Sequence, residues 1–313
     1  MALDEFALIR RYFTHPPRRR DVSLSVGDDA ALLVPESGQE LAVTTDTLLA
    51  GVHFPTDLPA DAVGYRSLAV NLSDIAAMGA APCWATLSLS LPRVDEAWVE
   101  AFARGFLELA TEFDVDLVGG DTVKGPLGIT VQLIGQVPAG AALTRAGARP
   151  GDQVMVSGVL GLAAAALQLR NDGRPVPEAA ARRFDKPYPR VALGLALRGH
   201  ASACIDISDG LTADIVHILT ASDCGALLDV EKIPTPDLGE AFSPDQCLQL
   251  ALVGGDDYEL CFTCSAQTAV RLSGSAEFAG CYAIGVVESR PGLRLRAPDG
   301  SYSDFLGQGY RHF

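Results

Sequence analysis

Positively charged side chains are scarce in this sequence of 313 residues. Its 24 lysines and arginines stand against 39 aspartates and glutamates, which gives a formal net charge of −15. The average surface of such a protein repels a polyanion such as DNA. Nucleic acid is therefore not expected as a partner.

Long apolar runs are also missing. No stretch approaches the roughly 18 consecutive apolar residues that a membrane span requires, and the opening MALDEFALIRRYF carries acids without an uninterrupted apolar segment. With 48% hydrophobic residues the chain can still bury two cores. We expect a soluble, cytoplasmic protein with no membrane partner.

Cysteines are too few and too scattered for a secreted disulfide scaffold. A C-x-x-C motif, Cys261 to Cys264, lies in a predicted strand, where positions three apart point to opposite faces, and no second pair completes a zinc site. We expect reduced, buried thiols. The seven cysteines are Cys83, Cys204, Cys224, Cys247, Cys261, Cys264 and Cys281.

The familiar phosphate-binding motifs are absent as well. The chain contains no G-x-x-x-x-G-K-[ST] loop and neither the H-R-D nor the D-F-G motif of protein kinases. SGVLGLAAAAL at 157–167 is typical of a glycine turn that opens a helix. Such a turn can bind an anion or serve helix–sheet packing, and the pattern leaves both open.

Hydrophobic periodicity predicts helices and strands along the whole chain. Residues 4–13 are expected to form an amphipathic helix capped by Asp4. In the first half, strands are predicted at 40–49, 83–91, 115–121 and 128–137, and helices at 60–80 and 95–113. In the second half, strands are predicted near 154–157, 203–207, 226–230, 258–263 and 279–287, and helices near 161–170, 189–199, 210–221, 244–252 and 266–273.

The segment 138–153, PAGAALTRAGARPGDQ, is the best candidate for a domain boundary, because it is rich in Gly, Ala and Pro. We therefore expect two domains, 1–138 and 150–313. Both halves have a mixed α/β (α+β) pattern.

Two short motifs recur at one offset. Ser-Asp occurs at 73–74 and 208–209, and Gly-Gly-Asp occurs at 119–121 and 254–256, in each case 135 residues apart. The spacing is compatible with a duplicated unit and also with coincidence.

Aspartates recur next to Gly, Ser or Thr at the ends of apolar elements. Each alone is explained by a helix N-cap or a turn, but clustered carboxylates in a partly buried setting repel one another and require cations. Mg²⁺ fits, since it bridges carboxylates to phosphates, and the glycines before Asp121 would let backbone N–H groups approach a phosphate. These acids are Asp28, Asp29, Asp46, Asp74, Asp121, Asp206, Asp209, Asp256 and Asp257.

Jointly, these segments resemble the thiamine-monophosphate kinases, members of an ATP-binding superfamily that includes aminoimidazole ribonucleotide synthetase and selenophosphate synthetase. The resemblance covers nearly the whole chain. It is carried by VGDDAALL, TTDTLLAGVHF, AVNLSDIAAMGA, GGDT, LTRAGARPGD, DISDGL and GGDDYELCFT.

The resemblance implies a two-domain fold like that of aminoimidazole ribonucleotide synthetase and transfer of the γ-phosphoryl group of ATP to thiamine monophosphate. It implies a homodimer, in which domain 1–138 binds ATP and metal and domain 150–313 completes the site. Implied metal ligands are Asp29, Thr44, Thr45, Asp46, Asp74, Asp121, Asp206 and Asp209. Implied ATP contacts are Gly120, Asp121, Arg145 and Ser208, and implied thiamine contacts are His53, Asp256 and Tyr310.

No side chain is expected to act as a general base, because a phosphate monoester, with a second pKa of about 6, is already largely ionised at neutral pH. Catalysis then reduces to alignment and charge neutralisation by metal ions and Arg145. From spacing alone, Arg145 could equally be an ordinary surface residue. His53 is better assigned as a substrate contact than as a catalyst, with a structural histidine as the less favoured alternative.

Two residues depart from the family pattern. Asp256 stands where the family commonly has Glu, so its reach to the substrate is in question, and Thr44 stands where Ser can occur, which preserves the hydroxyl. The rival functions are an ATP-dependent cyclase like aminoimidazole ribonucleotide synthetase and a non-catalytic Mg-nucleotide-binding protein. Selenophosphate synthetase fits less well, because no Cys precedes Cys83.

Overall fold

The computed structural model describes residues 4–305 and 309–310. The chain divides into two compact units. The first extends to Ile75 and resumes at Ala80–Gly140, whereas the second comprises Ala76–Gly79 and the chain from Ala141 onward. The change of unit at Gly140 falls inside the Gly-, Ala- and Pro-rich segment 138–153.

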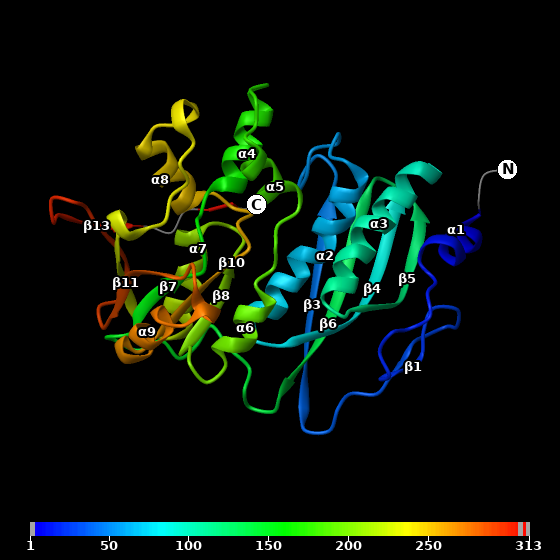
Figure 1. Cartoon of the computed structure of the whole chain (residues 1–313), viewed down its shortest axis with the longest axis horizontal. Coiled ribbons are helices and arrows are strands. Elements are labelled where there is room, and N and C mark those ends of the chain that lie inside the picture. Colours follow the sequence, from blue (N-terminus) through cyan, green and yellow to red (C-terminus); the bar gives the residue numbers. More distant parts are fainter. Residues whose placement is uncertain (1–3, 306–308, 311–313) are drawn as a thin grey trace. The chain divides into compact units, whose positions relative to one another are not determined.

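The first unit contains a four-stranded mixed sheet in its described residues, in the order β3-β6-β4-β5. β4 pairs antiparallel with β6 and parallel with β5, and β3 pairs antiparallel with β6. Helices α2 and α3 run alongside these strands (Figure 1). The elements are α1 (Glu5–Tyr12), β1 (Val22–Leu24), β2 (Leu32–Leu33), β3 (Gln39–Leu49), α2 (Ala60–Ala77), β4 (Ala81–Leu91), α3 (Glu96–Glu112), β5 (Asp116–Lys124) and β6 (Gly128–Pro138).

The second unit is built on a mixed sheet of seven strands among its described residues, in the order β13-β12-β9-β11-β7-β10-β8. Its strands are β7 (Gln153–Val156), β8 (Ala203–Ile207), β9 (Gly225–Asp229), β10 (Glu259–Cys264), β11 (Tyr282–Glu288), β12 (Gly292–Arg296) and β13 (Tyr302–Phe305). Its helices are α4 (Leu162–Asn171), α5 (Glu178–Asp185), α6 (Val191–Leu197), α7 (Leu211–Ala221), α8 (Pro244–Val253) and α9 (Ala266–Ser273), with short 3₁₀ turns at Val230–Lys232, Gly239–Ala241 and Ala276–Phe278.

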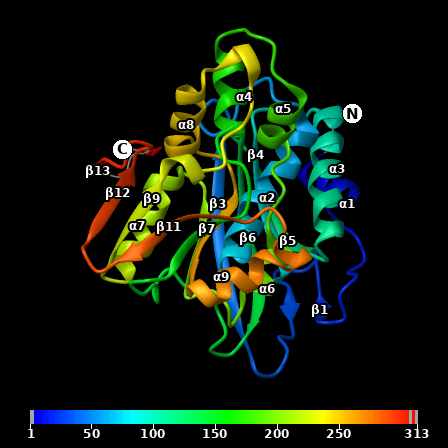
Figure 2. The same ribbon diagram turned by 60° about the vertical axis from the view of Figure 1, so that its left-hand side comes forward.

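A single apolar core joins α7 to this sheet. Ile205, Ile215 and Ile218 lie in it together with Leu228 and Cys261, all of them buried. α7 lies against the sheet, and α4 packs against α5 and α8 (Figure 1, Figure 2). The predicted mixed α/β organisation is confirmed.

The predicted helices and strands are also confirmed, with ends shifted by a few residues. Asp4 caps α1, as expected, because its Oδ1 accepts a hydrogen bond from the Ala7 backbone N–H (2.7 Å). The elements that periodicity missed are short or polar: β1, β2, α5, β12 and β13.

The duplication hypothesis is wrong at the motifs that suggested it. Ser73–Asp74 lies inside helix α2, whereas Ser208–Asp209 lies in the turn between β8 and α7. The first Gly-Gly-Asp, 119–121, lies within β5, whereas the second, 254–256, lies between α8 and β10. The shared offset therefore connects positions of different local structure.

The cysteines are free thiols, and all except the half-buried Cys281 are buried. Cys261 and Cys264 both lie on β10 with no exposed surface. Burial raises the pKa of Cys264 to about 11 and raises the pKa of Cys261 further. Since the thiolate is the reactive and metal-binding form, this C-x-x-C motif is suited to packing and not to metal or redox chemistry.

Across residues 4–305 and 309–310, the helices are all too short or too polar to cross a membrane.

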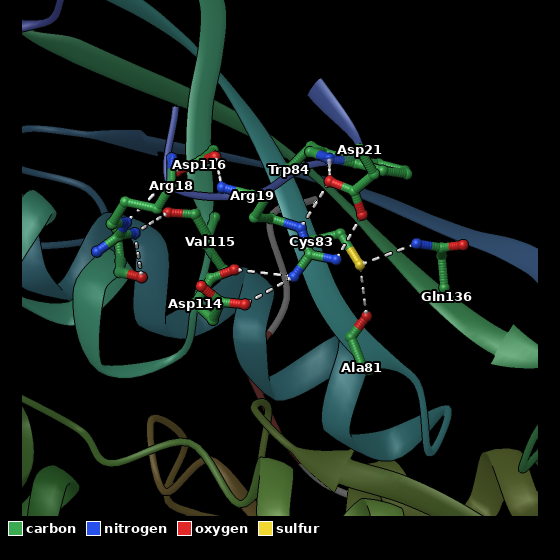
Figure 3. A network of polar contacts seen from close by, with 11 residues as sticks. Arg18, Arg19, Asp21, Ala81, Cys83, Trp84, Asp114, Val115, Asp116 and Gln136 are labelled. Carbon is green, nitrogen blue, oxygen red and sulfur yellow. Dashed lines mark hydrogen bonds and ion pairs between the residues drawn. The ribbon is translucent and has the colours of Figure 1, made fainter. Parts of the chain in front are cut away.

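A polar network anchors the segment before β1 to the first unit (Figure 3). The Asp116 carboxylate accepts hydrogen bonds from the backbone N–H groups of Arg18 (3.2 Å) and Arg19 (2.9 Å). The Arg19 guanidinium pairs with Asp21 (2.7 Å), whose Oδ1 accepts a hydrogen bond from Trp84 Nε1 (3.1 Å). One buried carboxylate thus holds two consecutive residues of this segment at the start of β5.

We expect Asp116→Asn to lower the free energy of unfolding by about 1–3 kcal/mol, because an amide N–H₂ would face the Arg18 and Arg19 donors. Asp114→Asn is the matched control, since this neighbouring acid is exposed and its carboxylate pairs with Arg19 (3.0 Å); its effect should stay below about 1 kcal/mol. Urea unfolding measures both. Equal losses in the two variants would contradict the role of Asp116.

Candidate active site

Three of the predicted metal ligands come together in the first unit. Thr44 and Asp46 alternate with exposed residues along β3, so they share one face of the strand. Asp74 lies on α2, and its Oδ2 accepts a hydrogen bond from Thr44 Oγ1. This bond shows that the face of β3 bearing Thr44 and Asp46 is turned toward α2.

The electrostatics of this group suit a divalent cation. Burial, and then the negative charge of Asp74, raise the pKa of Asp46 to about 6. Two neighbouring carboxylates and a hydroxyl are hard oxygen donors, and Mg²⁺ commonly uses one or two carboxylates while phosphates and water complete its shell. Among the residues described, no three His, Cys, Asp or Glu side chains are grouped closely enough to hold a metal ion.

Two further predicted ligands of the first unit lie apart from this group. Thr45 is exposed on the other face of β3. Asp121 on β5 is exposed too, and it is paired in register with the exposed Ser88 of β4. Because β5 is three strands from β3, its backbone is roughly 14 Å away across the sheet. In one chain, Asp121 is therefore not grouped with Asp46.

The backbone at Gly120 requires glycine. Its φ is 153°, and a Cβ there would lie 1.9 Å from the Leu87 carbonyl oxygen. Only a residue without a side chain allows β5 to lie this close to β4 at the position before Asp121.

Asp29 and His53 are each held by a local turn. The Asp29 backbone N–H donates to Asp28 Oδ1 (2.8 Å), which gives Asp28 a structural role in this exposed loop. The Leu49 backbone N–H donates to His53 Nδ1 (3.0 Å), which requires that Nδ1 carry no proton. The ring is thus oriented by β3, the strand that also bears Asp46.

In the second unit, four predicted residues meet around one turn. The Asp256 backbone N–H donates to the Ser208 carbonyl oxygen (2.8 Å), and the Tyr310 backbone N–H donates to the Asp209 carbonyl oxygen (3.2 Å). The residues predicted separately for nucleotide, metal and substrate are therefore neighbours here. Asp206 precedes them on β8, where its side chain is buried.

Arg145 is not brought to this turn by its backbone. Its carbonyl oxygen accepts a hydrogen bond from Ser222 Oγ (3.3 Å). Ser222 caps the C-terminal end of α7, whereas Ser208 precedes the N-terminal end. A helix of this length separates the two positions by about 16 Å.

Three acids near the turn were given no role from the sequence: Asp257 was counted among the clustered acids without being assigned as a ligand, and Asp214 and Glu259 were not singled out. Asp214 accepts three backbone hydrogen bonds from the turn itself. Both oxygens of the fully buried Asp257 accept a hydrogen bond from the Gly161 N–H (2.9 and 2.8 Å) at the start of α4. The buried Glu259 binds the guanidinium groups of Arg183 and Arg190. The partners of Asp257 and Glu259 named here lie 69 to 96 residues away in sequence, so no local pattern could reveal them. Asp214 lies only four to six residues from the amides that it binds, so its place on the first turn of a helix was a local signal.

The Asp257 contact resolves the two uses left open for the glycine turn at 157–167. At the N-terminus of α4, both oxygens of the Asp257 carboxyl group accept the Gly161 N–H, and burial raises the pKa of this group well above its usual range. The protein fills this position itself, which ties α4 to the strand β10 that follows Asp257.

Comparison with known proteins identifies the family. Residues 27–137 match the N-terminal domain of AIR synthase related proteins, and residues 149–298 match their C-terminal domain. Thiamine-monophosphate kinase from Escherichia coli K12 is 50% identical over 272 residues, covering 84% of this chain and 83% of that relative.

The chain belongs to the thiamine-monophosphate kinase family. The crystal structure of thiamine-monophosphate kinase from Stenotrophomonas maltophilia K279a superposes with a TM-score of 0.86 at 44% identity, covering 96% of this chain and 98% of that chain. AaThiL complexed with AMPPCP and TMP gives a TM-score of 0.80 at 33% identity, covering 93% of each chain. The predicted two-domain fold of this family is confirmed.

The reach of Asp256, which the sequence left in question, is limited by its local structure. Asp256 adopts a positive φ of 69°, a conformation that Asp tolerates better than most residues. Its Oδ1 accepts a hydrogen bond from the Tyr258 hydroxyl (3.1 Å). The Asp256 carboxylate is therefore bonded to a residue only two positions further along the chain. At Thr44 the hydroxyl donates to Asp74, a bond that a Ser at this position could equally form.

We expect Asp46→Asn to stabilise the Mg²⁺-free protein at pH 8. The folded pKa of about 6 lies above the ordinary 3.8, so folding favours the protonated Asp46. The stability that this preference contributes is fully present below about pH 3.8 and is lost as the pH rises through 6. Removing the charge should raise the free energy of unfolding by about 1–2 kcal/mol at pH 8, and the difference from wild type should vanish near pH 4.

Urea unfolding at the two pH values measures this difference. Asp121→Asn serves as the control, because its exposed side chain should leave stability within about 0.5 kcal/mol of wild type at both pH values. An Asp46→Asn variant that is less stable than wild type at pH 8 would contradict the repulsion between Asp46 and Asp74.

Proposed function

We propose that this protein phosphorylates thiamine monophosphate with ATP, which yields thiamine diphosphate and ADP. The observation that carries this proposal is membership of the thiamine-monophosphate kinase family over nearly the whole chain. The related AaThiL, whose fold this chain shares, has been seen with AMPPCP and TMP together. Both substrates of the proposed reaction thus have a counterpart in a relative of the same architecture.

The chemistry suits a site rich in Asp and poor in nucleophiles. The acceptor phosphate of thiamine monophosphate is largely ionised at neutral pH, since its second pKa is about 6. No side chain has to remove a proton, and direct in-line transfer requires alignment and neutralisation of the phosphate charges. No residue is therefore assigned as a general base or nucleophile.

The metal ligands are assigned by motif, and Mg²⁺ fits the oxygen donors of Thr44, Asp46 and Asp74. When bound, Mg²⁺ would neutralise and orient the phosphates of ATP. Thr44, by its hydrogen bond to Asp74, holds that carboxylate in place beside Asp46. The full proposed set is Asp29, Thr44, Thr45, Asp46, Asp74, Asp121, Asp206 and Asp209.

The substrate contacts follow the same correspondence. Gly120, Asp121, Arg145 and Ser208 are proposed to hold ATP, and His53, Asp256 and Tyr310 are proposed to contact the thiamine moiety. Support comes from the second unit, where Ser208, Asp256 and Tyr310 lie around one turn. A nucleotide contact and two substrate contacts in one place suit a direct transfer between the two molecules.

We also propose a homodimer formed through the first unit. β3 is an edge strand of the described sheet, and an edge strand offers unpaired backbone groups. The face of β3 opposite Asp46 exposes Leu41 (48%), Val43 (56%) and Leu49. Covering these side chains with a second copy would remove an apolar surface from water.

A cytoplasmic location is proposed with it. The cysteines of the described chain are free thiols, and most of them are buried, which suits a reducing compartment.

Turnover is expected to depend on the acids of the first unit. Asp46→Asn and Asp121→Asn should each lower thiamine diphosphate formation by about 100-fold or more, while circular dichroism shows an intact fold. The assay incubates the protein with ATP, Mg²⁺ and thiamine monophosphate and separates the thiamine species.

The control for this assay is Asp114→Asn, an exposed acid outside the proposed site, which should keep activity within about twofold of wild type. Near-normal activity of both site variants at saturating Mg²⁺ would refute the assignment. Wild-type protein that binds ATP without forming thiamine diphosphate would indicate a non-catalytic nucleotide-binding protein.

Sedimentation velocity tests the dimer. Wild type should sediment as a dimer, and Val43→Glu should shift it toward monomer, because a buried interfacial charge costs several kcal/mol. The matched control is Val270→Glu on α9, a residue with 77% exposure outside the β3 face, which should remain dimeric. A monomeric wild type, or a dimer unaffected by Val43→Glu, would contradict the proposal.

A further inference from the structure

The turn 208–210 is organised by a single carboxylate. Asp214 lies on the first turn of α7, and its Oδ2 accepts hydrogen bonds from the backbone N–H groups of Ser208 (3.0 Å), Asp209 (3.0 Å) and Gly210 (3.1 Å). All three consecutive amides of the turn therefore point at one oxygen. The Asp214 side chain belongs to a residue with only 3% exposure, so water does not compete effectively for these bonds.

The backbone of the turn 208–210 is also restricted by the residues that pack around it. Gly210 has a φ of 116°, and a Cβ there would lie 2.9 Å from the Val253 backbone. On the other side, the Ser208 carbonyl oxygen is bonded to the Asp256 N–H. The backbone of the turn is thus held by Asp214 from one side and by the segment before β10 from the other.

The Asp214 side chain occupies the N-terminus of α7, which affects how a phosphate could bind there. The N-terminus of a helix, with its converging N–H groups, is a common site for a phosphate. In α7 that position is already filled by the protein's own carboxylate. The amides of the turn are therefore unavailable to a nucleotide, and the turn can contact one only through the side chains of Ser208 and Asp209.

We propose that Asp214 is a positioning residue that orients Ser208 and Asp209 toward the nucleotide and its metal. This inference rests on the proposed function, in which Ser208 contacts ATP and Asp209 binds Mg²⁺. Asp214 binds the three amides of the turn and so fixes its backbone. The fixed backbone in turn sets the direction in which the side chains of Ser208 and Asp209 point. It contacts neither substrate itself.

Amide hydrogen exchange tests the geometry without reference to activity. In full-length wild type, the amides of residues 208–210 should exchange slowly, since a buried acceptor protects all three. Asp214→Ala should accelerate their exchange by about tenfold or more, with the rest of α7 remaining protected. Asp214→Asn, which keeps a neutral acceptor oxygen, should give an intermediate rate, because charge-assisted bonds are roughly twice as strong.

Binding of a nonhydrolysable ATP analogue with Mg²⁺ tests the consequence. Asp214→Ala should weaken it by about tenfold or more, and Asp214→Asn should restore it to within about threefold of wild type. Asp152→Ala is the matched control, because Asp152 is also buried and accepts bonds from the Arg149 N–H (3.0 Å) and Ser202 Oγ (2.6 Å) in another turn. It should lose stability but bind the analogue within about twofold of wild type.

The outcomes separate the two hypotheses. A folded Asp214→Ala that binds the analogue and Mg²⁺ like wild type would overturn the positioning role, as would rapid exchange at 208–210 in wild type. Should Asp214→Ala not fold, an Asp214→Asn variant with unchanged exchange and unchanged binding would overturn it too. Wild type that binds the analogue with a protected turn but forms no thiamine diphosphate would refute the kinase proposal and leave the role of Asp214 standing.

Discussion

The burial of carboxylate charge is the constraint on which this structure depends. A buried carboxylate must be satisfied by donors or by a cation, because its desolvation is costly. Asp257 has the Gly161 N–H, and Glu259 has two guanidinium groups. Burial nevertheless raises the pKa of Asp257. Asp46 differs in its neighbour, because the nearby charge is another acid, Asp74, which adds to the effect of burial in raising the pKa of Asp46. Acids with fixed donors hold the fold together, and the acids that repel each other suit a bound cation.

The second unit also contains both kinds of acid, one bonded to fixed donors and one proposed to bind a cation. Asp214 lies behind the turn 208–210 and uses its amides, while Asp209 belongs to the turn itself. The turn also meets the segment that carries Asp256 and the backbone of Tyr310. One short stretch between β8 and α7 thus connects the residues proposed for metal, nucleotide and substrate, so that their mutual spacing depends on a few backbone hydrogen bonds.

In the first unit, the alternation of a β-strand lets β3 serve two purposes. Thr44 and Asp46 face α2, where a hydrogen bond to Asp74 orients the group. Leu41 and Val43 face the other way and are exposed. Since successive side chains point to opposite faces, the proposed metal site and the proposed dimer interface are parts of one strand. A shift of register by one residue would exchange them.

Sequence alone determined the elements whose signal is local: the helix capped by Asp4, the alternating strands, the buried thiols and the mixed α/β organisation. Periodicity missed α5, where only Ala180 and Phe184 are buried, and the short strand β12. Motif resemblance named Ser208, Asp209, Asp256 and Tyr310, but only the tertiary structure decided that they lie together. The tertiary structure also decided that Asp121 is three strands from Asp46. It placed the Asp257 side chain at the N-terminus of α4. Hydrophobic periodicity involves neighbouring residues, whereas the donors and charges around Asp46, Asp257 and Glu259 come from residues far away along the chain.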